Sequence, residues 1–397
     1  MKKFSILSLA LMCSASSFAQ QALWGAGDVV SPKINSDNSV TFSIFAPEAQ
    51  KIEVTGDFLP TKKVQTPMGE MDAPGATALA KNDKGVWEYT STPLAPELYS
   101  YSFVIDGVKV TDPSSIYQIR DVASVTSVFI VEGERANLYK VNDVPHGSVA
   151  RVWYSSPTLK IDRRMTIYTP PGYEKGEAKY PVLYLLHGAG GDEEAWIALG
   201  RTSQILDNLI AQGKAKPMVV VMTNGNAGQK AAPGESERGM YKPSLWEETK
   251  MNGDFEAAFP DVVSYVETNY RVEQEKQSRA ICGLSMGGFH SLHISKQYPD
   301  LFDYVGLFSA AIMPPQQGVS SKVYDDFDEK LKVQFSKKPK LYWIAIGTAD
   351  FLFQNNVDFR KKLDENGYKY EYYETGEGHI WKNWRIYLAE FAPKLFK

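Results

Sequence analysis

The sequence predicts two domains, an all-β domain followed by an α/β domain built on a mostly parallel sheet. In residues 22–134, short segments alternate polar and apolar side chains, as half-buried strands do. From Val144 onward, buried-strand runs such as 182–186 alternate with helical patterns such as 203–212, which is typical of a parallel sheet covered by helices on both faces. The length of 397 residues exceeds what one hydrophobic core usually holds, so two domains are expected.

The all-β domain is defined by four alternating segments, at residues 39–45, 51–55, 85–90 and 99–105. The last segment runs into Asp106-Gly107, and an Asp-Gly pair between two strands is a strong signal for a tight hairpin. Short strands with turn signals between them predict an immunoglobulin-like β-sandwich of about a hundred residues. A linker at 135–143 is expected to lead into the second domain at 144–397.

Residues 1–19 have the pattern of a secretory signal peptide. Lys2 and Lys3 precede an apolar run, and Ser17-Phe18-Ala19 forms a small-x-small cleavage site. Because the run is much shorter than the roughly 20 residues that cross a bilayer, we expect no membrane span. Export to a periplasm or beyond is the expected localisation. The net charge of −4, without long basic runs, argues against nucleic acid as a partner.

The segment Gly283-Leu284-Ser285-Met286-Gly287 matches the pattern G-x-S-x-G. Apolar residues 280–282 before it suit a buried strand end, and a helical pattern follows from Phe289. In α/β-hydrolases this motif turns a strand sharply into a helix and leaves the serine hydroxyl exposed. The second domain is therefore predicted to be an α/β-hydrolase with Ser285 as its nucleophile.

A nucleophilic serine needs a histidine to take its proton and a carboxylate to orient that histidine. In this fold the chain order is Ser, then Asp or Glu, then His. Of the five histidines, only His379 follows the serine and lies off the helix that carries His290 and His293. His379 is therefore the predicted base.

The predicted acid is Asp350, with Asp358 as the alternative. Asp350 follows the apolar strand pattern 341–346, and catalytic groups in open α/β sheets lie beyond the carboxyl ends of strands. Asp358 falls on a helical pattern at 356–366, where a solvated face is its expected position.

The oxyanion hole needs two backbone N–H donors aimed at the developing charge. One is expected from Met286, directly after the nucleophile. The second is expected from the loop that follows strand 182–186, from Ala189 or alternatively from Gly190. His187, in the same loop, is expected to brace it rather than to act as a base.

Residues 227–254 form a long polar connection after a central strand, so this segment is either a loop at the mouth of the active site or a surface excursion. If it lies at the mouth, Tyr241 and Trp246 could contact substrate. Trp381, two residues after the predicted base, is a third candidate contact. No histidine and carboxylate cluster has metal-ligand spacing, so neither a metal nor an organic cofactor is expected.

Both domains resemble known families. The first resembles family 48 carbohydrate-binding modules in Phe45-Ala46-Pro47, Gly85-Val86-Trp87, Tyr99 to Phe103 and Asp106-Gly107. Some members of that family stack sugars on aromatic rings and others only dock, so Trp87 is either a ligand contact or a core residue.

The second domain resembles carbohydrate esterase family 1, which includes feruloyl esterases, acetyl-xylan esterases and enterochelin-esterase-like relatives. The motifs that carry the resemblance are 168–173, 184–188, 283–288 and 378–381. The resemblance implies the same catalytic residues, Ser285, Asp350 and His379. One departure is Glu377, where the family usually has a glycine.

The expected function is that of an exported serine esterase that releases ferulate from plant cell-wall arabinoxylan. Its expected partners are feruloylated or acetylated plant polysaccharides and their oligosaccharides. Three alternatives stay open: an acetyl-xylan esterase, an esterase of enterochelin-type siderophores, and a polysaccharide-binding protein with an inert hydrolase domain.

Overall fold

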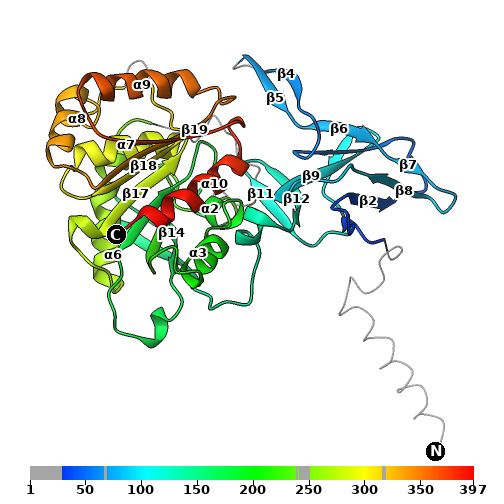
Figure 1. Cartoon of the computed structure of the whole chain (residues 1–397), viewed down its shortest axis with the longest axis horizontal. Coiled ribbons are helices and arrows are strands. Elements are labelled where there is room, and N and C mark those ends of the chain that lie inside the picture. Colours follow the sequence, from blue (N-terminus) through cyan, green and yellow to red (C-terminus); the bar gives the residue numbers. More distant parts are fainter. Residues whose placement is uncertain (1–28, 67–68, 238–239, 241–250, 315–318) are drawn as a thin grey trace, which may run out of the picture. The chain divides into compact units, whose positions relative to one another are not determined.

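The computed structural model of the chain describes residues 29–66, 69–237, 240, 251–314 and 319–397 (Figure 1). These residues form two compact units. The first contains residues up to 95 together with 99–118 and 127–129, and the second contains 96–98, 119–126 and 130–397. The predicted fold class is confirmed, because antiparallel β-sheets precede a mostly parallel sheet with helices. Among the described residues, no helix is long and apolar enough to cross a bilayer.

The first unit is built from three antiparallel groups of strands. One sheet has the order β1-β2-β8-β7, a larger one has the order β11-β12-β9-β3-β6 with β10 paired to β9, and β4 pairs with β5. Parts of β9, β11 and β12 belong to the second unit. The strand bounds are β1 Lys33–Ile34, β2 Val40–Phe45, β3 Ile52–Gly56, β4 Lys62–Thr66, β5 Gly69–Ala73, β6 Gly75–Ala78, β7 Ala80–Lys81, β8 Val86–Thr90, β9 Glu97–Ile105, β10 Val108–Val110, β11 Gln118–Asp121 and β12 Ser124–Val131.

The local sequence explains two features of this unit. Asp106 and Gly107 have φ values of 48° and 90°, and Ile105 pairs directly with Val108, so the Asp-Gly pair forms the predicted hairpin. Trp87 is 8% exposed and its indole N–H donates to the carbonyl oxygen of Ala46 at 2.9 Å. Trp87 is therefore a core residue.

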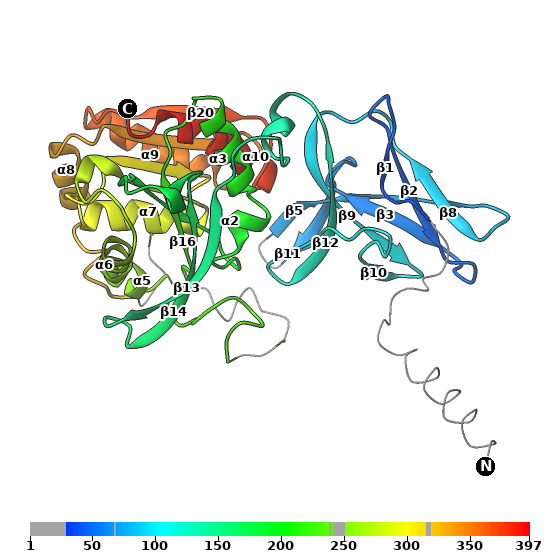
Figure 2. The same cartoon turned by 90° about the horizontal axis from the view of Figure 1, so that it is seen from below.

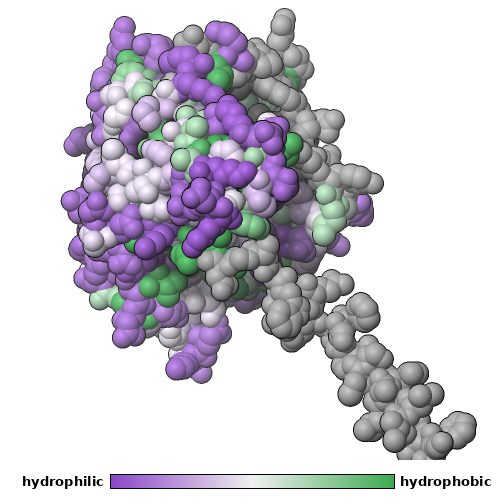
Figure 3. All heavy atoms as spheres, turned by 90° about the vertical axis from the view of Figure 1, so that its right-hand side faces the viewer, coloured by the Kyte–Doolittle hydropathy of each residue, from purple (hydrophilic) through white to green (hydrophobic). Residues whose placement is uncertain are grey.

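Among the described residues of the first unit, Phe45 and Tyr117 are the most exposed aromatic side chains, at 41% and 44%. Figure 3 views the chain from the right-hand side of Figure 1. Hydrophilic side chains cover much of the visible described surface, and apolar ones form small separate areas. Scattered apolar residues of this kind are ordinary on protein surfaces.

The second unit contains an eight-stranded sheet with the order β13-β14-β16-β15-β17-β18-β19-β20. β14 is antiparallel to β13 and to β16, and all later pairs are parallel. The bounds are β13 Ser148–Ser156, β14 Ile161–Thr169, β15 Val182–Leu186, β16 Val219–Thr223, β17 Arg279–Leu284, β18 Tyr304–Phe308, β19 Leu341–Gly347 and β20 Glu371–Thr375. β15 to β19 are buried along their whole length, as a parallel sheet between two helical layers requires.

Helices cover both faces of this sheet (Figures 1 and 2). α3 packs with α2 and α10, whereas α7 packs with α5 and α8. The α-helices are α2 Ala195–Ala198, α3 Thr202–Ala211, α5 Asp254–Ala257, α6 Phe259–Asn269, α7 Met286–Gln297, α8 Phe327–Ser336, α9 Phe353–Glu365 and α10 Trp381–Phe391. The 3₁₀-helices are η1 Glu134–Leu138, η2 Tyr173–Lys175, η3 Lys276–Ser278 and η4 Ala392–Lys394.

Residues 135–143, predicted as a linker, are packed onto the second unit. Tyr139 is fully buried, and its carbonyl oxygen accepts a hydrogen bond of 2.7 Å from Arg201 Nε. The carbonyl oxygen of Leu138 accepts another, of 3.0 Å, from the amide of Asn208.

Candidate active site

Three predicted catalytic residues follow neighbouring parallel strands. Ser285 comes directly after β17, Asp350 lies three residues beyond β19, and His379 lies four residues beyond β20. Since β17 to β20 are all parallel, their carboxyl ends lie at one edge of the sheet. The fold therefore brings all three residues to the same edge.

Ser285 sits on a strained turn between β17 and α7. Its φ is 52° and its ψ is −114°, a conformation that costs a residue with a side chain about 1–3 kcal/mol. The surrounding backbone holds it there: its N–H donates to Phe308 at 2.9 Å, and its carbonyl oxygen accepts from Phe289 and Ala311 at 3.0 Å. A Cβ at Gly283 would lie 2.4 Å from the backbone of Gly287, so this close crossing requires glycine.

His379 is held by Asp350. The imidazole Nδ1 lies 2.9 Å from Asp350 Oδ2, and the carboxylate side chain is fully buried, while that of His379 is 17% exposed. Asp350 Oδ1 accepts the N–H of Leu352 at 2.9 Å, so both carboxylate oxygens are engaged. A carboxylate accepts, so the hydrogen sits on Nδ1 and leaves Nε2 free to take a proton.

The alternative acid has different surroundings. Asp358 is exposed on α9, and its Oδ1 accepts a hydrogen bond of 2.8 Å from the side-chain amide of Gln354. It therefore has the solvated position that its helical pattern predicts.

The loop after β15 lies against the nucleophile. A Cβ at Gly188 would lie 3.2 Å from Ser285 Cβ, and one at Gly287 would lie 2.4 Å from the carbonyl oxygen of Leu186. The start of α7, with the buried Met286, thus packs on the end of β15. Ala189 and Gly190 lie inside the turn that the 3.1 Å hydrogen bond from Gly191 N–H to the Gly188 carbonyl closes.

His187 braces this loop. Its Nδ1 lies 2.7 Å from the carbonyl oxygen of Gly188, and the N–H of Gly225 donates to its Nε2 at 2.7 Å. Because a carbonyl accepts and a backbone N–H donates, the ring is neutral with its hydrogen on Nδ1. Burial lowers the pKa of His187 to about 4, in agreement with the neutral ring.

A buried charge network holds the other end of the same loop. Glu193, fully buried, accepts hydrogen bonds of 2.8 Å from Arg164 on β14 and from the N–H of Ala232, and one of 3.2 Å from the side chain of Asn224 after β16. Burial raises the pKa of Glu193, and the Arg164 guanidinium opposes that rise. Sequence reasoning missed this network, since Glu193 belongs to no motif.

Of the three residues predicted to contact substrate, the structure describes Trp381 only. Tyr241 and Trp246 lie outside the described residues. The described beginning of the same segment is packed, with Ala231 and Ala232 buried. Trp381 packs edge-on against Trp196, with ring centroids 5.3 Å apart, and its role as a substrate contact stays a prediction.

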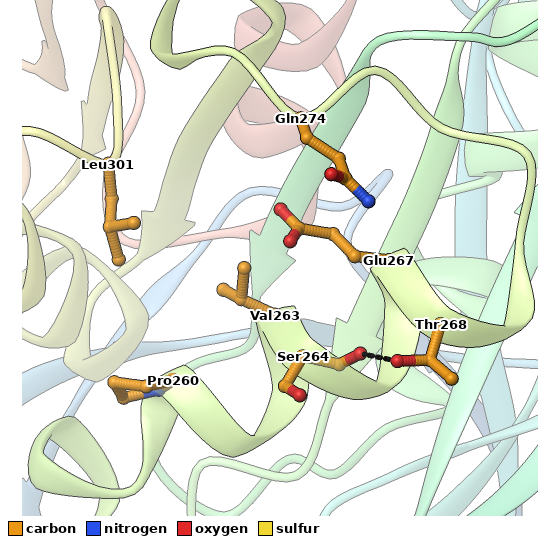
Figure 4. A pocket seen from close by; sticks show the side chains of 7 residues that line it. All are labelled: Pro260, Val263, Ser264, Glu267, Thr268, Gln274 and Leu301. Atoms are coloured by element: carbon orange, nitrogen blue, oxygen red, sulfur yellow. Dashed lines mark hydrogen bonds between the residues drawn. The ribbon is translucent and has the colours of Figure 1, made fainter.

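A separate pocket lies along α6 (Figure 4). It is lined by Pro260, Val263, Ser264, Glu267, Thr268, Gln274 and Leu301. Its one charged lining residue, Glu267, accepts a hydrogen bond of 3.0 Å from Arg279 Nε. The pocket holds none of the predicted catalytic residues. Among the described residues, no group of three or more His, Cys, Asp or Glu side chains could hold a metal ion.

Both units match known protein families. Residues 156–395 match the family described as "Putative esterase", and residues 29–116 match carbohydrate-binding module 48, the isoamylase N-terminal domain. The chain belongs to this esterase family. Its hydrolase domain resembles serine esterases of the feruloyl esterase type.

Individual relatives agree with this family. An endo-1,4-β-xylanase/feruloyl esterase of Xylanibacter ruminicola is 28% identical over 377 residues, which are 92% of this chain and 46% of that protein. The chain therefore spans less than half of that relative.

Solved structures give the same fold. A family 1 ferulic acid esterase of Anaeromyces mucronatus, solved in complex with ferulic acid, is 25% identical with a TM-score of 0.53, over 65% of this chain and 93% of its own. The enterobactin esterase of Shigella flexneri is 17% identical with a TM-score of 0.61, over 90% of this chain and 93% of its own. This second likeness concerns the fold alone.

Proposed function

We propose that this protein is an exported serine esterase that releases ferulic acid from feruloylated arabinoxylan, with acetylated xylan as the alternative substrate. The observation that carries the proposal is the 2.9 Å hydrogen bond between His379 and the buried Asp350, at the sheet edge where Ser285 leaves its strand. The relatives whose names include feruloyl or ferulic acid esterase support a hydroxycinnamoyl substrate.

In the proposed mechanism Ser285 Oγ attacks the ester carbonyl carbon while His379 Nε2 takes the serine proton. The N–H groups of Met286 and Ala189 hold the oxyanion. The imidazolium then gives its proton to the leaving sugar oxygen, which departs as an alcohol and leaves the acyl group on Ser285. Water attacks this acyl-enzyme, with His379 again as the base, and the acid is released.

The first test is hydrolysis of methyl ferulate and of an aryl acetate by the mature protein. Efficient release of ferulate supports a hydroxycinnamoyl ester as the substrate, and cleavage of the acetate alone favours acetyl-xylan as the substrate. The Ser285→Ala variant should lose about 10⁴-fold or more in kcat, because no other group forms the acyl-enzyme. Substantial residual turnover in this variant would contradict the assigned nucleophile.

One alternative needs a test of its own. The fold likeness to the enterobactin esterase extends over 90% of the chain, so an enterobactin-type trilactone belongs in the same assay. Faster cleavage of the trilactone than of methyl ferulate would favour the siderophore esterase. Binding to feruloylated xylan without any ester cleavage would favour the inert polysaccharide-binding protein.

Export is a part of the proposal that rests on residues 1–19 and on the size of the substrate. A feruloylated polysaccharide cannot enter the cytoplasm, so an enzyme that acts on it has to leave the cytoplasm. The N-terminal sequence of the protein recovered from outside the cytoplasm should begin at Gln20. Recovery of the intact N-terminus in the cytoplasm would contradict export.

A further inference from the structure

An exposed aromatic ring lies directly against the predicted base. Phe351, the residue after Asp350, is 59% exposed, and its ring centroid lies 4.6 Å from that of the His379 imidazole. Leaving a phenylalanine side chain largely in water forgoes part of the favourable free energy that its full burial would contribute. The position of this ring beside His379, rather than its exposure alone, is what calls for a functional explanation.

The backbone that carries this ring is fixed by the predicted catalytic acid. The N–H of Phe353 donates to the carbonyl oxygen of Asp350 at 2.9 Å, and the N–H of Leu352 donates to Asp350 Oδ1 at 2.9 Å. Leu352 is buried in a hydrophobic cluster that also holds Phe289 of α7. Phe351 is thus presented from a rigid turn, so little conformational entropy is lost when a ligand covers it.

The other rings around the base are already packed against protein. Trp384 contacts His379 with centroids 4.9 Å apart, but it is only 6% exposed. Trp381 packs edge-on against Trp384 at 5.1 Å as well as against Trp196. Phe351 is the ring of this group that offers most of its surface to a ligand.

The proposed mechanism predicts which part of a substrate would contact a ring beside His379. The base that takes the serine proton later gives it to the leaving oxygen, so the leaving alcohol lies beside the imidazole. A ring that packs on His379 and is itself exposed therefore lies toward the alcohol part of the ester rather than the acyl part. In a feruloylated polysaccharide the alcohol is a sugar, and the C–H faces of sugar rings are apolar enough to stack on an aromatic ring.

We propose that Phe351 forms a sugar-binding platform for the alcohol part of the substrate. This inference rests on the proposed esterase function and adds to it a residue that selects the leaving group. Ile380, the residue after His379 in sequence, is also partly exposed, at 39%.

The test compares two esters with the same acyl group, methyl ferulate and a feruloylated arabinofuranosyl xylo-oligosaccharide. For Phe351→Ala we expect kcat/KM on the sugar ester to fall about tenfold, with methyl ferulate changed less than about twofold, since only the sugar ester reaches the platform. Phe351→Trp should keep the activity on the sugar ester. The matched control is Trp153→Ala, which removes a ring on β13 that is 49% exposed and should change neither substrate.

Equal losses on both esters, or no loss on either, would overturn the platform. If the parent enzyme cleaves acetyl esters only, the ferulate proposal fails, and the same comparison is made with an acetylated xylo-oligosaccharide and an acetate ester of a small alcohol. A selective loss on the sugar acetate then still supports Phe351 as the platform. A parent enzyme that cleaves no sugar ester at all overturns it.

Discussion

At the scale of single residues, Asp350 and Asp358 differ in surroundings in a way that separates their roles. Asp350→Asn keeps the shape of the side chain, but its amide can donate to His379 Nδ1 and so favours the tautomer whose Nε2 cannot take a proton. We expect kcat on methyl ferulate to fall by about 10³–10⁴, while near-ultraviolet circular dichroism stays unchanged. Asp358→Asn, made on the exposed face of α9, should keep activity within about twofold. The opposite pattern would assign the acid to Asp358.

The buried His187 predicts how the stability of the protein depends on pH. Its pKa is lowered to about 4 in the folded protein, whereas an unperturbed histidine has a pKa of about 6.5. Between these values the unfolded chain binds more protons than the folded one, so stability is lost as the pH falls through this window. At pH 5 the loss from this residue should be about 2 kcal/mol relative to pH 7.5.

Urea unfolding of the parent and of His187→Gln at both pH values isolates this effect. Glutamine keeps a donor and an acceptor but does not titrate. The contribution of all other titrating groups is the same in both proteins, so it cancels when their pH-dependent losses of stability are compared. The parent should lose about 2 kcal/mol more than the variant between pH 7.5 and pH 5. Equal losses in the two proteins would mean that His187 does not carry the acid sensitivity.

Local sequence predicts the candidate site unevenly. Ser285 and His379 follow from the elbow motif and the chain order, and Asp350 from its place after an apolar strand. Phe351 could not be predicted in the same way, because a phenylalanine that follows a strand is usually predicted to be buried in the core. Its exposure and its contact with His379 exist only in three dimensions.

At the scale of elements, the loop after β15 depends on Glu193. Glu193→Gln leaves the buried Arg164 guanidinium without its best partner, and breaking a buried ion pair costs about 3–5 kcal/mol. Because the loop also holds the predicted oxyanion donor Ala189, we expect kcat to fall about tenfold or more with little change in KM. Thermal unfolding and steady-state kinetics on methyl ferulate measure the two effects.

Glu194 offers a matched control on the next residue. It also contacts Arg164, at 2.9 Å, but its side chain is 27% exposed. Glu194→Gln should therefore cost at most about 1 kcal/mol and leave kcat unchanged. Similar losses in both variants would show that the loop is held by charge in general and not by the buried carboxylate.

The elements themselves follow well from pattern when they are long or strongly apolar. β15 and β19 were predicted within a residue because runs of apolar residues define them. β18 was missed, since Tyr304–Phe308 contains a glycine that weakens the strand signal. α8 was missed as well.

At the scale of the whole molecule, the second unit is discontinuous in sequence. It takes residues 96–98 and 119–126 from segments whose neighbours belong to the first unit. Pattern in the sequence marks where strands and helices occur, but it does not show that a few residues of one segment pack with a distant part of the chain. Such pairings depend on the tertiary fold.

Arg385 on α10 depends on this discontinuity. Its side chain is 3% exposed, and it donates to the Glu97 carboxylate at 3.1 Å and to the carbonyl oxygen of Leu98 at 2.9 Å. A chain that starts at residue 130 lacks both acceptors and keeps the carbonyl oxygen of Leu199, at 3.2 Å, and the ring of Tyr139, whose centroid lies 5.3 Å from the guanidinium. The truncated chain should therefore be less stable than the same unit in the full chain by about 3 kcal/mol, measured by urea unfolding. Full-length Glu97→Gln should reproduce much of this loss, and truncation should add little destabilisation in Arg385→Met. An equally stable truncated chain would contradict the dependence on Glu97 and Leu98.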